Sequence, residues 1–289
     1  MNNNLSVIIP LSTAFGGDET MRLREEALVH SINTFYSKHT GIELIFVCQN
    51  YTLPDKIESE CNEFYDPNKG NIPTEIRLDY PVFNKGWCIN VGARAAKYDT
   101  ICIAESDMWA PDPFLNDAVK YINNKEYRWC FGWNKLLYTS EVEREKVLSG
   151  ESFQLVSTGI NIVAPKVGGS EGGFVLFNKK FFFDIGGCNE WFEELGGPDN
   201  ELARRAGDAS HTYIKYHQFV YHLWHKPCRD NELFTRKHNR ILYCHTVANI
   251  QKTNRLLRKQ PFGNIESPLC STKSYEELWN ESHQDAPFA

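Results

Sequence analysis

A chain of 289 residues, 42% of them hydrophobic, is long enough to bury one large α/β core or two smaller ones. The formal net charge of −6 argues against a surface built mainly for nucleic acid, so a nucleic-acid partner is not expected, although the charge does not exclude one. No apolar run is long enough to span a membrane, and the first residues lack the features of a signal peptide.

The nine cysteines are scattered along the chain, and no two of them form a CxxC pair. This spacing argues against a zinc site built of cysteines and favours a reducing cytoplasm as the location of the chain. The basic run at 252–259 is most simply a solvated helix end, and the alternative is a peripheral contact with a membrane or a polyanion.

The first part of the chain alternates between short apolar runs and amphipathic stretches. Strands are predicted at 5–10, where Pro10 ends the run, and at 43–48, 75–78 and 101–104. Helices are predicted at 22–36, 54–64 and 87–96. This alternation predicts a Rossmann-like, mostly parallel α/β sheet flanked by helices, with ligands bound at the carboxyl ends of the strands.

The second part is less regular. Helices are predicted at 113–122, 140–148, 179–185, 201–206 and 231–258, the last broken near His245. Strands are predicted at 127–133, 156–165, 174–177 and 219–225. The chain from Pro261 onward is expected to be irregular, with one short amphipathic segment at 275–279.

Two carboxylates follow the predicted strand at 101–104. Glu105 and Asp107 stand at i and i+2, so their side chains are expected to point the same way and to repel each other. A hard divalent ion, Mg²⁺ or Mn²⁺, that also carries substrate phosphates would compensate this charge. A solvated acidic turn is the alternative, and the acid-x-acid triplet alone does not decide between the two.

Three further features carry candidate chemistry. His222 and His225 lie three residues apart on a predicted strand, so they are expected to face opposite sides and at most one is expected to meet a given metal. Asp199 precedes a predicted helix, where it is either a cap or a catalytic base. The glycine cluster at 168–173 is either a tight turn or a loop that closes over a site.

Five blocks stand in a defined order along most of the chain. They are Pro10 with RLREEAL at 22–28, FNK at 83–85 with NVGA at 90–93, the Glu105-x-Asp107 triplet, GGF at 172–174 with GGPDNE at 196–201, and HKPCRDNE at 225–232. Together they resemble the metal-dependent nucleotide-sugar glycosyltransferases of the GT-A type. The likeness is greatest to the galactosyltransferases that build lactosamine and to the bacterial chondroitin-polymerase-like enzymes of family 2.

The resemblance implies a role for individual residues. It implies nucleotide contacts at Pro10, at Arg22 or Arg24, at Gln49, at Phe83 against uracil, at Lys85 where the family has arginine, and at Glu105 and Asp107. It implies metal ligands at Asp107, His225 and Glu105, and a catalytic base at Asp199. Trp191, Glu201 and Gly173 fall on the acceptor side, with Trp191 expected to stack on a sugar face.

The resemblance also implies an activity and a division of the chain. Residues 1–245 are expected to form a single GT-A domain, with a nucleotide-binding half at 1–112 and an acceptor-binding half at 113–245, and 246–289 a C-terminal helical extension. The implied reaction is inverting transfer from a UDP-sugar to a hydroxyl of a glycan or glycoconjugate, with Mn²⁺ or Mg²⁺. The alternatives are a nucleotidyltransferase, although Gly16-Gly17 is a sparse phosphate loop, and an inactive sugar- or nucleotide-binding module.

Overall fold

The computed structural model describes eight stretches of the chain. They are 4–13, 18–123, 127–151, 172–194, 196–210, 213–215, 219–226 and 232–283. The predicted strand at 156–165 and most of the glycine cluster at 168–173 therefore lie outside the described residues. No helix within these stretches is long and apolar enough to cross a membrane.

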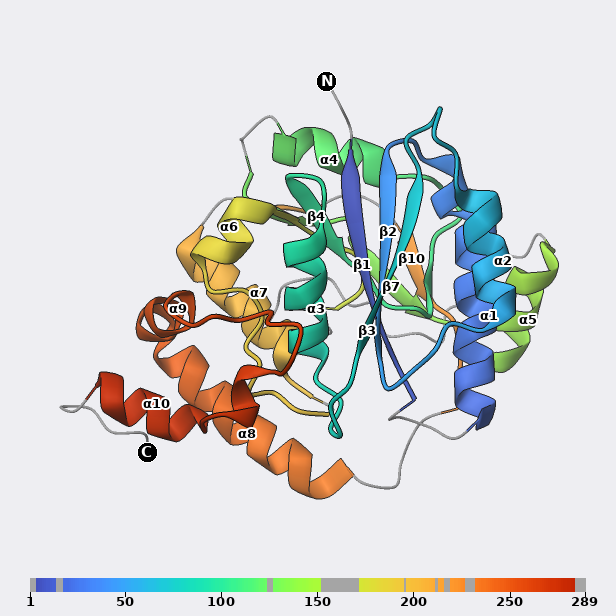
Figure 1. Ribbon diagram of the computed structural model, residues 1–289. Helices are drawn as coiled ribbons and strands as arrows, with labels where there is room; N and C mark the ends of the chain where they lie inside the picture. Colours follow the sequence, from blue (N-terminus) through green and yellow to red (C-terminus); the bar gives the residue numbers. More distant parts are fainter. Residues whose placement is uncertain are drawn as a thin grey trace.

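A seven-stranded sheet in the order β3-β2-β1-β4-β8-β6-β9 forms the centre of the molecule (Figure 1). Its strands are β1 (Leu5–Ser12), β2 (Ile42–Gln49), β3 (Ile72–Leu78), β4 (Thr100–Ile103), β6 (Trp129–Phe131), β8 (Val175–Asn178) and β9 (Tyr213–Lys215). Strands β3, β2, β1 and β4 are parallel, and β8 runs antiparallel to both of its neighbours. The prediction of a mostly parallel α/β sheet flanked by helices is confirmed.

A small second sheet lies beside the main one and was not predicted. It consists of β5 (Met108–Trp109), β7 (Lys135–Tyr138) and β10 (Phe219–His222), with β10 in the middle. Strand β10 is antiparallel to β5, and His222 pairs directly with Met108. This register places the end of β10 next to Asp107, the residue before β5.

The helices agree with the predicted positions to within a few residues. They are α1 (Asp18–Thr34), α2 (Asp55–Phe64), α3 (Lys85–Ala95), α4 (Leu115–Asn123), α5 (Glu141–Ser149), α6 (Lys179–Asp184), α7 (Pro198–Ala209), α8 (Glu232–Ala248), α9 (Ile250–Arg258) and α10 (Tyr275–Ser282). The break in the long C-terminal stretch falls at Asn249 and not near His245. Helix α7 begins at Pro198, because proline is pre-organised for the first helical position.

Strand β1 continues through Pro10, contrary to the prediction that proline ends it. Ile8 faces β4, since its carbonyl accepts a hydrogen bond from Ala104 N at 3.0 Å. Pro10, two residues later, faces the same way, but the pairing of β1 with β4 has ended at Ile8. The missing N–H of Pro10 therefore removes no bond from the sheet, and β1 keeps its pairing with β2 as far as Ser12.

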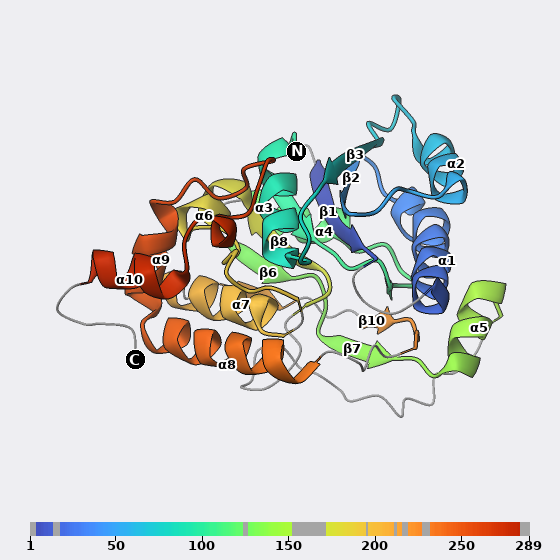
Figure 2. The ribbon, with the colours of Figure 1, turned by 60° about the horizontal axis from the view of Figure 1, so that its bottom comes forward.

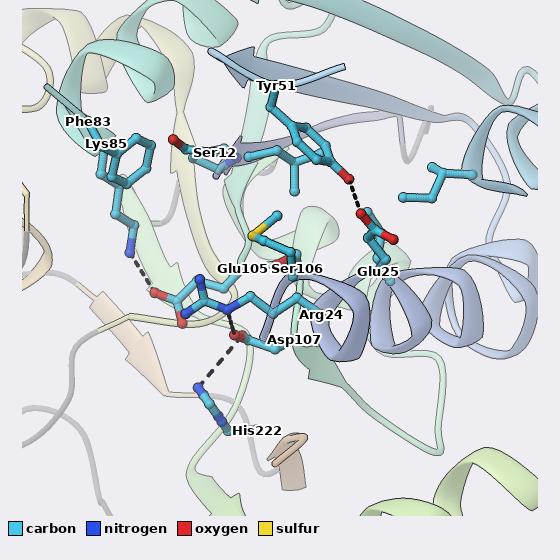
Figure 3. Close-up of a pocket in the computed structure, with 15 residues that line it drawn as sticks. Ser12, Arg24, Glu25, Tyr51, Phe83, Lys85, Glu105, Ser106, Asp107 and His222 are labelled. Carbon is cyan, nitrogen blue, oxygen red and sulfur yellow. Dashed lines mark hydrogen bonds and ion pairs between the residues drawn. The ribbon is translucent and has the colours of Figure 1, made fainter. Parts of the chain in front are cut away.

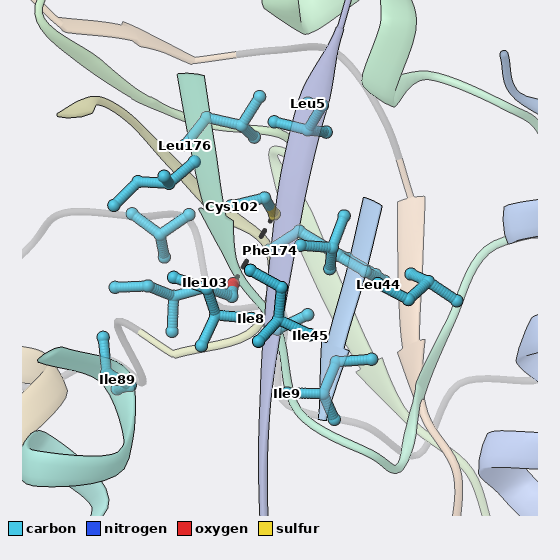
Figure 4. Close-up of a cluster of buried hydrophobic side chains, with 14 of the residues drawn as sticks. Leu5, Ile8, Ile9, Leu44, Ile45, Ile89, Cys102, Ile103, Phe174 and Leu176 are labelled. Atoms are coloured by element: carbon cyan, nitrogen blue, oxygen red, sulfur yellow. Dashed lines mark hydrogen bonds between the residues drawn. The ribbon is translucent and has the colours of Figure 1, made fainter. Parts of the chain in front are cut away.

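The core is densest around β1, between β2 and β4 (Figure 4). Ile8, Leu44, Ile45 and Cys102 are fully buried there. Burial in this apolar setting raises the pKa of the Cys102 thiol well above its usual value, so it packs as a small hydrophobe. This rigid centre fixes the carboxyl ends of β1 and β4, where the candidate site lies.

The C-terminal helices pack against the main body through α7 (Figure 2). A second apolar cluster joins Trp191 and Phe192 to residues of α8, α9 and α10. Fully buried Glu190 ties down the segment between α9 and α10, because its carboxylate accepts hydrogen bonds from Gly263 N at 2.6 Å and Leu269 N at 2.8 Å. Helix α8 runs without interruption across the boundary expected at 245.

Candidate active site

A pocket of about 190 Å³ opens at the carboxyl ends of β1 and β4 (Figure 3). Six of the predicted nucleotide-side residues line it: Pro10, Arg24, Phe83, Lys85, Glu105 and Asp107. Ligands of doubly wound α/β folds bind at this edge of the sheet, because loops from neighbouring strands leave a crevice there. The position of the pocket is therefore the one that the strand order predicts.

A cluster of potential metal ligands lies at one end of this pocket. The ligating atoms of Asp107, His222 and His225 lie within 4.8 Å of one another. His225 Nε2 is 3.1 Å from Asp107 Oδ2, and His222 Nε2 is 3.7 Å from Asp107 Oδ1. The expectation that only one histidine meets the metal site is wrong, because β10 ends at His222 and the alternation of a strand no longer applies at His225.

The electrostatics of Asp107 suit a bound cation. The carboxyl group is only 4% exposed, and burial alone would raise its pKa. His222, His225 and Arg24 more than offset this effect and hold the pKa well below its usual range. Asp107 Oδ1 is buried and has no hydrogen-bond partner among the described residues. A buried carboxylate oxygen with free lone pairs, facing two imidazoles, fits a divalent metal.

Glu105 lies with a different partner. Its Oε1 is 2.5 Å from Lys85 Nζ, which is also 2.8 Å from Asp199 Oδ2. Within the described residues the group of ligating atoms does not include Glu105. Burial would lower the pKa of the Lys85 ammonium, but the two carboxylates hold it well above its usual value. The Lys85 ammonium therefore keeps its positive charge between the carboxylates of Glu105 and Asp199.

The structure separates the two candidate arginines. Arg24 lines the pocket, with Nε 3.4 Å from Asp107 Oδ2. Arg22, two residues earlier in α1 and therefore on the opposite side of the helix, is exposed and pairs with Glu26 at 2.5 Å. Of the two, only Arg24 is placed to meet a ligand in this pocket.

Gln49 is buried beneath the pocket and does not line it. Its amide donates to Tyr80 O at 2.9 Å and Val82 O at 2.7 Å, and its Oε1 accepts from Asn84 N at 2.9 Å. All of these partners belong to the segment that carries Phe83. The expected nucleotide contact is therefore corrected: Gln49 holds the loop that lines the pocket.

The acceptor-side residues expected from the resemblance also need correction. Trp191 is 5% exposed, donates its indole N–H to Lys273 O at 2.7 Å and packs edge-to-face against Tyr275, so its ring lies in the C-terminal cluster and offers no free face to a sugar. Glu201 is fully buried in an ion pair with Arg205 at 2.7 Å. Gly173 has φ +90°, and a Cβ there would lie 3.0 Å from Met108 Cε. A glycine is therefore needed at this position for backbone conformation and close packing.

Sequence reasoning missed part of the pocket wall. Glu25 of α1 and Tyr51 line the pocket, and Tyr51 Oη donates to Glu25 Oε1 at 2.9 Å. Tyr51 lies two residues beyond the end of β2, and that position near a strand end is the signal that identifies it. Glu25 carried no comparable signal, since it belongs to a charged helix face.

Comparisons with known proteins show the fold. No protein-family model matches the chain, and no curated protein matches its sequence. S. aureus TarS 1–349 in complex with UDP-GlcNAc has a TM-score of 0.54 at 11% identity, covering 98% of this chain and 73% of that one. GalNAc-T7 with UDP, GalNAc and Mn²⁺ has a TM-score of 0.53 at 14% identity, covering 99% and 55%.

A third solved structure matches less of this chain. The mannosyltransferase PcManGT from Pyrobaculum calidifontis, in complex with GDP-Man and Mn²⁺, has a TM-score of 0.50 at 14% identity. The match covers 86% of this chain and 64% of PcManGT, so this chain spans less than two thirds of that protein. The chain has the GT-A glycosyltransferase fold, as the sequence blocks predicted.

Proposed function

We propose that this chain is a divalent-metal-dependent glycosyltransferase that moves a sugar from a UDP-sugar to a hydroxyl of a glycan or glycoconjugate, with inversion. One observation carries the proposal: Asp107, His222 and His225 converge beside a pocket at the carboxyl ends of β1 and β4. The ligands named for three proteins of similar fold support it: UDP-GlcNAc for TarS, UDP, GalNAc and Mn²⁺ for GalNAc-T7, and GDP-Man and Mn²⁺ for PcManGT.

Asp107, His222 and His225 would hold the metal. When bound there, a divalent ion neutralises the negative charge that develops on the departing nucleotide diphosphate. Two imidazole nitrogens and one carboxylate oxygen suit a first-row transition metal better than Mg²⁺, which prefers an all-oxygen shell. Of the two expected ions, the donor set therefore favours Mn²⁺.

The remaining pocket residues would bind and orient the nucleotide. The Phe83 ring, partly buried at the pocket wall, offers a face for the base, and Arg24 brings a guanidinium to the phosphate end beside Asp107. Pro10, near the carboxyl end of β1, lines the pocket without presenting an N–H. In this arrangement the anomeric carbon of the donor would lie toward Asp199.

Asp199 would act as the general base. It lies in the first turn of α7, where the positive end of the helix dipole stabilises a carboxylate. Asp199 takes the proton of the acceptor hydroxyl, whose oxygen forms a bond to the anomeric carbon. The bond from that carbon to the diphosphate breaks on the opposite face, and its electron pair leaves with the nucleotide. Attack opposite the leaving group inverts the configuration.

A panel of UDP-sugars and GDP-mannose, assayed for nucleotide release with Mn²⁺, Mg²⁺ or EDTA, tests the proposal. We expect release from one donor, greatest with Mn²⁺ and lost with EDTA. Asp199→Asn should leave UDP binding intact and lower release by about 10²–10⁴-fold, since it keeps the shape of the side chain but removes the base. Pyrophosphate release from a nucleoside triphosphate would point instead to a nucleotidyltransferase. UDP binding without turnover of any donor would point to an inactive binding module.

A further inference from the structure

Lys85 links the donor pocket to the proposed base. Its side chain is 15% exposed, and its ammonium contacts Glu105 Oε1 at 2.5 Å and Asp199 Oδ2 at 2.8 Å. The resemblance predicts a phosphate contact at this position. Two of the three ammonium N–H groups instead donate short, charge-assisted hydrogen bonds to carboxylates.

The backbone that carries Lys85 is held rigidly. Asn84, which caps α3, accepts a hydrogen bond from Trp87 N at 2.8 Å and donates from its amide to Glu190 O at 2.6 Å. Lys85 is the first residue of α3, so this cap fixes the start of its side chain. A lysine on a locked helix end can set the position of a partner, because its own backbone does not move.

The three charges come from separate elements and meet only in the folded chain. Glu105 follows β4 and Asp199 belongs to the first turn of α7, while Lys85 begins α3. A Cβ built at Gly172 would lie 3.0 Å from Glu105 Oε1 and 3.5 Å from Asp199 Oδ2, so the backbone of a glycine covers the pair. Without the ammonium, two carboxylates in this partly buried space would repel each other.

We propose that Lys85 is a positioning residue for transfer: it holds Asp199 by Oδ2, which leaves Oδ1 to take the acceptor proton. The role rests on the proposed function, because it acts through the base of that reaction. It differs from the expected phosphate contact in a measurable way. A phosphate contact changes donor affinity, whereas a residue that orients the base changes kcat.

The test compares Lys85→Met, Lys85→Arg and the control Lys180→Met. Lys180 forms a comparable ion pair with Asp184, but on the exposed surface of α6. The assay is Mn²⁺-dependent nucleotide release from the donor that the wild type turns over, with UDP affinity measured by calorimetry. We expect Lys85→Met to lower kcat at least about tenfold, with donor KM and UDP affinity within about twofold of wild type. Lys85→Arg should recover part of kcat, and the control should match wild type.

A double-mutant cycle shows whether Lys85 acts through Asp199. In an Asp199→Asn background, Lys85→Met should lower kcat little further, because the carboxylate that Lys85 positions is already absent. If Lys85→Met lowered kcat as much in the Asp199→Asn background as in the wild type, the proposal would be overturned. So would a weaker donor KM and UDP affinity at unchanged kcat, since that result describes a phosphate contact. Should Lys85→Met not fold, Lys85→Arg carries the test through the same split between kcat and KM. A wild type that neither binds UDP nor releases it would instead overturn the proposed function itself.

Discussion

Replacing His39 with glutamine should remove part of the acid sensitivity of the fold. His39 is 1% exposed, and both ring nitrogens are engaged: Nδ1 donates to Phe35 O at 2.9 Å, and Nε2 accepts from Leu115 N at 3.2 Å. A proton added at Nε2 would face the Leu115 N–H. Burial lowers the pKa of His39 from 6.5 to about 4, although the hydrogen bond to Phe35 opposes this effect.

The sign of the effect follows from the two pKa values. As the pH falls below 6.5, the unfolded chain takes up a proton that the folded chain accepts only near pH 4. The free energy of unfolding therefore falls over this window, by about 2 kcal/mol between pH 7 and pH 5 and by about 3 kcal/mol in all. Glutamine can donate to Phe35 O and accept from Leu115 N without titrating.

Urea unfolding at pH 7 and pH 5 measures this difference. The wild type should lose about 2 kcal/mol more than His39→Gln between these two pH values. His30, whose pKa burial also lowers to about 4, titrates in both proteins and cancels in the comparison. Equal losses in the two proteins would refute the assignment of a neutral, buried His39.

Three other changes test the site and its support. His222→Ala should weaken Mn²⁺ binding about tenfold or more in a calorimetric titration with the metal alone, and unchanged affinity would remove His222 from the site. Arg24→Ala should weaken UDP binding about tenfold, while Arg22→Ala should leave UDP affinity within about twofold of the wild type. Equal effects of the two changes would contradict the placement of these side chains. Gly92→Ala should lower the free energy of unfolding by about 1–3 kcal/mol in denaturant titration, because the added Cβ would lie 2.5 Å from Ile8 Cγ2. An unchanged free energy of unfolding would show that α3 can shift away from β1.

Most of the main sheet could be predicted because its strands carry local signals; β9 (Tyr213–Lys215), at its edge, was not predicted. Val7 to Ile9 and Ile101 to Ile103 are continuous apolar runs between amphipathic helices, which is typical of buried parallel strands. The second sheet could not be predicted, because β5 and β7 are short and are stabilised by pairing with β10, which is distant in the sequence. Such pairing leaves little trace in composition.

The site was predictable where position at a strand end decides the role. Asp107 reaches the pocket because it follows β4 at this edge of the sheet, whereas Lys85, which begins α3, was identified only by the matching block. Trp191 and Glu201 were misassigned because a matching block places a residue along the chain but does not show which way its side chain turns. His222 was underrated because the strand rule was extended past the end of β10.

UDP binding with and without Mn²⁺, measured by calorimetry on the wild type and on Asp107→Asn, tests the central claim most directly. The account predicts that Mn²⁺ tightens UDP binding to the wild type at least about tenfold, because Asp107, His222 and His225 would hold a metal that attracts the diphosphate. Asp107→Asn should lose this gain. UDP that binds equally well with Mn²⁺ and with EDTA, or does not bind at all, would contradict the account.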